Sequence, residues 1–193
     1  MTMPAPSMSV RYCAPPNSAI SEVRPSKGKR MKLMFIFPFI LLFTFSANTA
    51  FAGEAGQCQA QGGSFLSGTV TQGPSFAAGH IRDGVELSHT HITLQGEQDG
   101  ESYDVAMDNV FASGYDAAGE AVPSPLSSIA VGDKLDLCGE LYQSGGVGIH
   151  WVHTDCGKSP TPSAPNGWVK IIETDGTLGP NFENSQEYCK LWP

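Results

Sequence analysis

The stretch VGDKLDLCGELYQSGGVGIHWVHTD, residues 131–155, decides the fold of this chain. In residues 135–142, Leu, Leu, Gly and Leu alternate with Asp, Cys, Glu and Tyr, which is the period of two of a half-buried strand. Ser144-Gly145-Gly146 follows, and tight hairpin turns need residues that accept positive φ. Residues 147–154 resume a β-rich pattern. The stretch therefore predicts a β-hairpin that ends in His150, Trp151 and His153.

Further strands are expected on both sides of this hairpin. The patterns upstream predict a strand at 64–71, a glycine-rich loop at 72–84 that contains His80, strands at 85–95 and 102–107, and a connector at 108–130 with room for a short helix. Residues 167–173 can add a sixth strand. Five strands with a long connection between the third and fourth predict an all-β, OB-like Greek-key barrel, with a small β-sandwich as the alternative.

The first third of the chain has the layout of a secretory signal. Residues 27–32 are basic, residues 33–45 are apolar, and Ala50-Phe51-Ala52 is a small-x-small cleavage site. An uncleaved anchor over residues 33–52 is the alternative, and Met31 is a second candidate start. We therefore expect an extension and signal peptide at 1–52, an OB-like domain at 53–156, and a proline-rich segment with a packed tail at 157–193.

Charge excludes one class of partner. Residues 53–193 carry five basic and 18 acidic side chains, a formal net charge of −13. Nucleic-acid affinity depends on Lys and Arg side chains that neutralise phosphates, so nucleic acid is not expected as a partner. An acidic surface instead favours basic proteins.

The cysteines agree with export. Cys58, Cys138, Cys156 and Cys189 remain after the signal, an even set that predicts two disulfides in an oxidising compartment, periplasmic or extracellular. No stable membrane anchor is expected after cleavage. Of the three possible connectivities we favour Cys138–Cys156 and Cys58–Cys189.

Part of the chain resembles a known family. The segment GELYQSGGVGIHWVHTD followed by Gly167-Trp168 is similar to the shared segment of a domain-of-unknown-function family of short exported bacterial proteins, a glycine hairpin that leads into Ile-His-Trp-x-His-x-Asp. The turn at 131–133, and the strand bearing His89 with Val105 in its partner, keep the family's order. The resemblance spans roughly residues 68–168. It implies an OB-like β fold and export, but no known activity. Cys138, Cys156, the proline run and the long tail depart from the family pattern.

Histidine pairs are the candidate metal ligands. His89 and His91 are two residues apart on one strand, so their side chains share a face, a spacing that suits Zn²⁺ or Cu²⁺. His150 and His153 are separated by an odd number and need a bulge to share a face. His153 can complete a site with His89 and His91, and Asp155 can supply an oxygen. The alternative is that these side chains lie on a solvent-exposed polar face and bind no metal.

Tryptophans are the candidate ligand-binding groups. Trp151, with His150 and His153 beside it, can form a stacking surface at the mouth of the barrel, and Trp168 can cover the same mouth. The alternative role of Trp151 is core packing.

These features favour a small exported binding module for a glycan, a small polar ligand or a protein. A histidine-based metal carrier or metal-dependent enzyme is one alternative, and an inhibitor of an extracellular enzyme is another. No catalytic residue is predicted, because the chain has neither a G-x-S-x-G elbow nor a phosphate-binding glycine loop. No feature indicates an oligomeric state.

Overall fold

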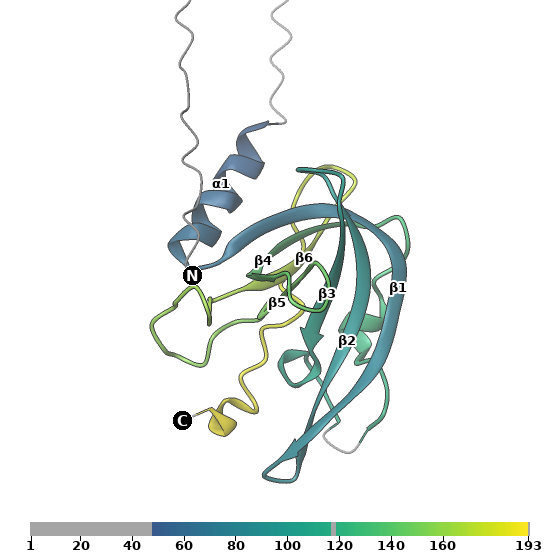
Figure 1. Ribbon diagram of the computed structural model, residues 1–193, viewed down its shortest axis with the longest axis vertical. Helices are drawn as coiled ribbons and strands as arrows, with labels where there is room; N and C mark the ends of the chain where they lie inside the picture. The colour runs from purple at the N-terminus through teal and green to yellow at the C-terminus, as the bar shows by residue number, and fades with distance from the viewer. Residues whose placement is uncertain (1–47, 117–118, 193) are drawn as a thin grey trace, which may run out of the picture. The chain divides into compact units, whose positions relative to one another are not determined.

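The computed structural model describes residues 48–116 and 119–192, with side chains from residue 53 onward. Most of the predicted signal peptide lies outside these residues. The strands are β1 (Ser64–Arg82), β2 (Val85–Gly96), β3 (Ser102–Asp108), β4 (Lys134–Tyr142), β5 (Gly148–His150) and β6 (Trp168–Ile172) (Figure 1). The helices are α1 (Asn48–Ala60) and α2 (Ser124–Ser127), with 3₁₀ turns at Asn109–Phe111 and Cys189–Leu191. Within the described part of the chain, no helix is both long enough and apolar enough to cross a membrane.

Five of the strands close into a ring. β1 pairs with β2, β2 with β3, β5 with β4, and β4 with β1, all antiparallel, while β3 and β5 pair in parallel. The order β1-β2-β3-β5-β4 is that of an OB-type Greek-key barrel, so the predicted fold is confirmed. β6 extends the sheet from β4.

The glycine turn forms as predicted. Gly145 and Gly146 have φ of 84° and 145°, and Tyr142 pairs with Gly148 across the hairpin. β5 is shorter than the β-rich stretch predicted at 147–154, and it ends at His150.

β1 is longer than expected. Residues 72–84, predicted as a loop, continue the strand to Arg82 and pair with β2. Gly73-Pro74 lies within the register shift between Gln72 and Ser75, and Gly79 within the shift between Ala77 and His80. Glycine and proline therefore mark β-bulges that bend one strand, where the sequence pattern indicated a break.

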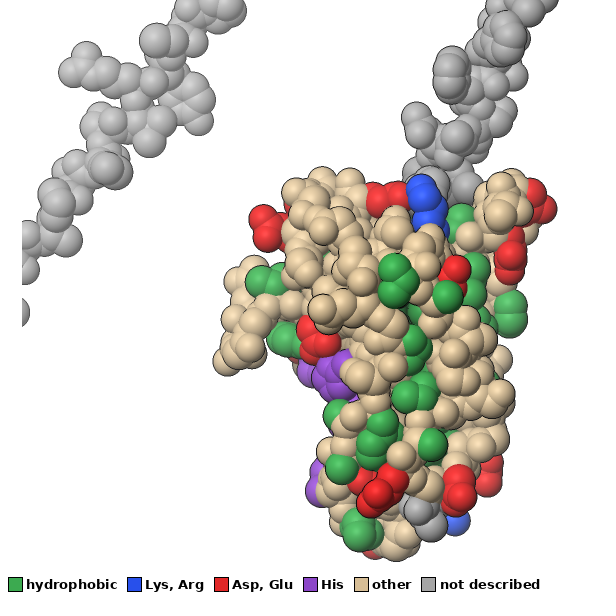
Figure 2. Space-filling view, turned by 90° about the vertical axis from the view of Figure 1, so that its right-hand side faces the viewer, with side chains coloured by type: hydrophobic (Ala, Val, Ile, Leu, Met, Phe, Trp, Pro, Cys, Tyr) green, Lys and Arg blue, Asp and Glu red, His purple; other side chains and the backbone are tan. Residues whose placement is uncertain are grey.

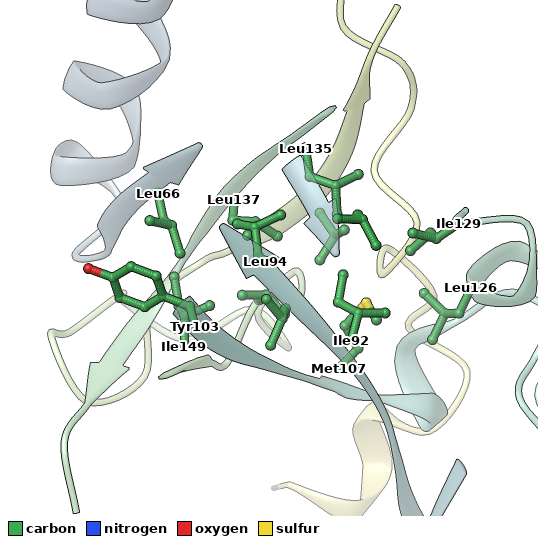
Figure 3. Close-up of a cluster of buried hydrophobic side chains, with 14 of the residues drawn as sticks. Leu66, Ile92, Leu94, Tyr103, Met107, Leu126, Ile129, Leu135, Leu137 and Ile149 are labelled. Carbon is green, nitrogen blue, oxygen red and sulfur yellow. The ribbon is translucent and has the colours of Figure 1, made fainter. Parts of the chain in front are cut away.

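The core lies inside the ring of strands. Figure 3 shows the side chains that point into it: Leu66, Ile92, Leu94, Tyr103, Met107, Leu126, Ile129, Leu135, Leu137 and Ile149. Leu126 and Ile129, both buried, come from the connector between β3 and β4, which confirms the predicted short helix there. Burying one such side chain stabilises the fold by about 1.5–3 kcal/mol.

The two disulfides have a different pairing from the one we favoured. They are Cys58–Cys138 and Cys156–Cys189. The antiparallel pairing of β1 with β4 puts Cys138 opposite Phe65, close to the end of α1 and therefore to Cys58. Cys156 leaves the hairpin region and meets the C-terminal tail. The number of bridges was predicted correctly, whereas the connectivity depended on strand pairings between distant parts of the chain.

Candidate functional site

Four of the five histidines line one cavity of about 240 Å³, which we call the histidine cavity. Its lining residues are His80, Leu87, His89, Ala106, Asp108, His150, Trp151, His153 and Trp192. The structure thus brings His89 of β2 together with His150, Trp151 and His153 from the end of the glycine hairpin. Figure 2 shows histidine side chains at the surface of one face of the molecule, with acidic side chains near them.

Asp108 is the centre of this cavity. Its Oδ1 lies 2.8 Å from Nε2 of His89, the residue opposite it on β2, and its Oδ2 lies 3.5 Å from Nε2 of His153. Burial alone would raise the pKa of Asp108, but the hydrogen bond from His89 and the charge of His153 bring this pKa below its ordinary value. Asp108 is therefore ionised at neutral pH, pairs with His89 and lies beside His153.

The pKa values of the His89 and His153 imidazoles shift in opposite directions. The hydrogen bond to Asp108 raises the pKa of His89 above its ordinary value, although burial opposes it. Burial lowers the pKa of His153, whose side chain is 3% exposed, and Asp108 only partly offsets this. Nδ1 of His153 lies 2.9 Å from the Thr154 carbonyl, which requires its proton on Nδ1 and turns Nε2 toward Asp108. The ring also stacks on Phe111 at 3.6 Å.

Trp151 explains how His150 and His153 reach the same cavity despite their odd spacing. Its φ is +53°, a left-handed conformation that bulky residues rarely adopt. The chain therefore leaves the alternation of a strand directly after β5. Strain of this kind persists only where the surroundings enforce it, and it gathers at functional sites.

Two glycines make room for this turn. A Cβ on Gly139 of β4 would overlap the carbonyl oxygen of His150, and a Cβ on Gly167 would overlap those of Cys138 and Trp151. Gly167 also donates its backbone N–H to the His153 carbonyl at 2.7 Å. Both glycines are thus needed for the backbone approach that aims the imidazoles.

A buried polar network supports the residue after Asp108. Asn109 accepts a hydrogen bond from the Thr90 hydroxyl at 2.6 Å and donates to the Ser88 hydroxyl at 2.9 Å. The Ser88 and Tyr115 hydroxyls lie 3.0 Å apart. These satisfied groups fix the start of the 3₁₀ turn and hence the position of Asp108.

Glu183 is a buried acid beside the cavity. Its side chain is fully buried, and among the described residues neither carboxyl oxygen has a hydrogen-bond partner. Burial raises the pKa of Glu183 well above its usual range, and the negative charge of Asp108 raises it further. Burial therefore disfavours the ionised form of Glu183 beside the charged Asp108.

A second, mostly apolar cavity of about 260 Å³ adjoins the first and shares Trp151, His153 and Trp192 with it. Its other walls are Phe111, Asp155, Cys156, Lys158, Ser159, Thr161, Ala164 and Pro165. Trp192 belongs to the C-terminal tail, which the Cys156–Cys189 disulfide ties to this loop. Its ring lies 5.3 Å from that of Phe111.

Two of the predicted site residues lie elsewhere. His91 shares the half-exposed face of β2 with His89, but its Nδ1 lies 2.9 Å from Asp104 instead of facing His153. Trp168 packs on the Cys58–Cys138 disulfide, and its indole N–H donates to Asp136 at 3.0 Å. It does not cover the mouth of the histidine cavity.

The predicted metal set of His89, His91 and His153 is therefore not assembled. In the described residues, no group of three or more His, Cys, Asp or Glu side chains is placed so that it could hold a metal ion.

Asp108, Glu183 and His80 were not predicted as site residues from the sequence. Asp108 stands at the end of a strand, where an acidic residue has an ordinary surface explanation. Glu183 lies in a tail without periodicity, and His80 lies in the stretch that was expected to be a loop.

The fold and site define a histidine-bearing OB-type barrel. No protein family, no curated protein and no solved structure matches the chain. The resemblance to the exported family of unknown function thus stays a prediction.

Proposed function

We propose that this chain is an exported binding module and that its ligand is a neutral glycan, held in the histidine cavity against Trp151. Export is supported by the predicted signal peptide and by two disulfides, which persist in oxidising compartments. The fold alone does not choose the ligand, because OB barrels have many functions. The chemistry of the cavity favours a neutral glycan.

The ionisable groups of the cavity already face one another inside the protein. Asp108 faces His89 and His153, and Nε2 of His150 lies 3.0 Å from Oε2 of Glu140. A charged ligand would have to compete with these pairs and leave the partly buried Asp108 carboxylate with a weaker partner, which is costly. Hydroxyl groups, which both donate and accept hydrogen bonds, can join such pairs without separating them.

The position of Trp151 is the main support for a glycan ligand. It borders both cavities, and its ring centroid lies 5.0 Å from that of His153. A sugar ring has a flat face of C–H groups and a rim of hydroxyls. It can pack its flat face on an indole while its rim reaches the Asp108 cluster. A polar cavity and an apolar cavity that meet at Trp151, His153 and Trp192 suit that shape.

We expect the loss of this ring to abolish most of the binding. The full chain, purified after export so that its disulfides form, is screened on an array of neutral and acidic glycans, and the best neutral glycan is titrated by calorimetry. Trp151→Ala is expected to weaken binding by about 10- to 100-fold, the usual cost of removing an aromatic anchor. Leu141→Ala, which truncates an exposed side chain that lines neither cavity, is the control and is expected to bind normally.

Two results would overturn the proposal: no neutral glycan binds, or Trp151→Ala binds with an unchanged Kd. The same preparation tests the alternatives. Stoichiometric zinc or copper that is lost in a His89→Ala/His91→Ala variant would favour the metal-binding prediction. Recovery of one basic protein in a pull-down would favour the inhibitor.

A further inference from the structure

A second polar hollow lies on the face of β2 and β3 that carries His89. It has a volume of about 220 Å³ and is lined by Gln72, Gly73, Ser75, His91, Ile92, Thr93 and Asp104. The histidine cavity does not include any of these residues.

The two hollows are neighbours along the same pair of strands. His89 and His91 are two residues apart on β2, on its half-exposed face, and their ring centroids are 6.2 Å apart. Ala106, which lines the histidine cavity, is the residue opposite His91 on β3, and Asp104 is two residues further along that strand. The hollows therefore form one strip across β2 and β3.

The second hollow repeats the chemistry of the first. His91 Nδ1 lies 2.9 and 3.0 Å from the two oxygens of Asp104, and the Tyr142 hydroxyl donates to Asp104 Oδ2 at 2.6 Å. The Thr93 hydroxyl donates to Oε1 of Gln72 at 2.8 Å. The carboxylate is thus already paired, and the side chains of Gln72, Ser75 and Thr93 are neutral donors and acceptors.

An extended peptide is a poor fit to this strip. Peptides that join a sheet bind through an unpaired strand edge. Along the strip, β2 is paired with β1 on one side and with β3 on the other, and β3 is paired with β5 at Asp104 and Val105. At this end of the strip both edges of β3 are paired, so the ligand is expected to be recognised by side chains on the face of the sheet.

We propose that the ligand is a linear neutral oligosaccharide, with one sugar unit on Trp151 in the histidine cavity and a following unit in the hollow formed by Gln72, His91 and Asp104. This rests on the proposed function and adds to it a second subsite. A single sugar fills only one hollow, so affinity must grow with the number of linked units.

Two series of linear sugars serve as probes: glucose to cellotetraose, and N-acetylglucosamine to its tetramer. With the full exported chain, calorimetry is expected to show a Kd that falls by about tenfold or more from the single sugar to the trimer in at least one series, because each added hydrogen-bonded contact contributes modestly. His91→Ala is expected to remove this gain while leaving the Kd of the single sugar unchanged.

Gln72→Ala removes one wall of the hollow and leaves the His91–Asp104 pair intact. It is expected to reduce the gain in affinity with length, and it tests the second subsite even if His91→Ala does not fold. Gln95→Ala, further along β2 and outside the hollow, is the matched control and is expected to keep the full gain with length.

The failures are distinguishable. Equal Kd values for single sugar and tetramer, with Trp151→Ala still weakening both, would overturn the second subsite and leave the proposed function standing. A gain with length that both His91→Ala and Gln72→Ala retain would also overturn it. No binding in either series would overturn the oligosaccharide proposal, and the glycan array then decides the proposed function separately.

Discussion

Replacing Cys58 and Cys138 together by serine is expected to lower the free energy of unfolding by about 4–5 kcal/mol. The two cysteines are 80 residues apart in sequence, and closing a loop of that length removes much of the conformational freedom of the unfolded chain. Both are fully buried and pack with Trp168, so the substitution also places polar atoms in an apolar cluster. A loss of this size is a large share of the stability of a typical domain.

Chemical denaturation of the oxidised proteins, followed by fluorescence, measures this effect. The matched control replaces Cys156 and Cys189, which are 33 residues apart, and is expected to cost less, about 3–4 kcal/mol. The control also frees the tail that bears Trp192, so its effect on glycan binding should be the larger of the two. A smaller loss of stability from Cys58/Cys138 than from Cys156/Cys189 would contradict the account.

Asp136→Asn is expected to stabilise the protein at pH 8 by about 1–3 kcal/mol. Asp136 lies on β4 and is 1% exposed; its Oδ1 accepts the indole N–H of Trp168, and its Oδ2 has no partner among the described residues. Burial raises the pKa of Asp136 to about 6, against an ordinary value of 3.8. Asparagine keeps the acceptor for Trp168 and removes the buried charge.

The pH dependence has a defined sign. The folded state holds the Asp136 proton up to about pH 6, whereas the unfolded chain releases it near 3.8, so the native protein loses stability as the pH rises through this window. Asp136→Asn should therefore match the native protein near pH 3 and exceed it increasingly up to about pH 7.

Denaturation at pH 3, 5 and 8 tests this, with Glu173→Gln, an exposed acid on the segment after β6, as the control that should change little. An equal difference between native protein and Asp136→Asn at all three pH values would exclude a titrating Asp136 as the cause.

The barrel was predictable because its signals are local. Leu135 and Leu137 are buried in the core as their spacing indicated, and the turn at Gly145-Gly146 forms. The alternation does not extend further along β4, because Asp136 and Cys138 are buried as well and Leu141 is exposed. The extent of β1 was not predictable from the sequence, because Gly73, Pro74 and Gly79 occur in a bulged strand as readily as in a loop. Whether they break a strand is decided by the pairing partner β2, which is not visible in a single stretch of sequence.

The site was only partly predictable for a similar reason. His89 and the His150–His153 segment stood out by residue type, and the hairpin indicated where they would meet. Asp108, Glu183 and Trp192 depend on the paths of the connector and the tail. Those paths are set by the buried polar network and by the Cys156–Cys189 bridge, whose connectivity the sequence leaves open.

In the structure one carboxylate, Asp108, pairs with His89 and lies beside His153 in a common cavity. Titration of the histidine ring protons by NMR tests it directly. We expect a pKa above the ordinary 6.5 for His89 and below 6.5 for His153, and a fall in the pKa of His89 when Asp108 is replaced by asparagine. Two histidines that both titrate near 6.5 and do not respond to Asp108→Asn would contradict it.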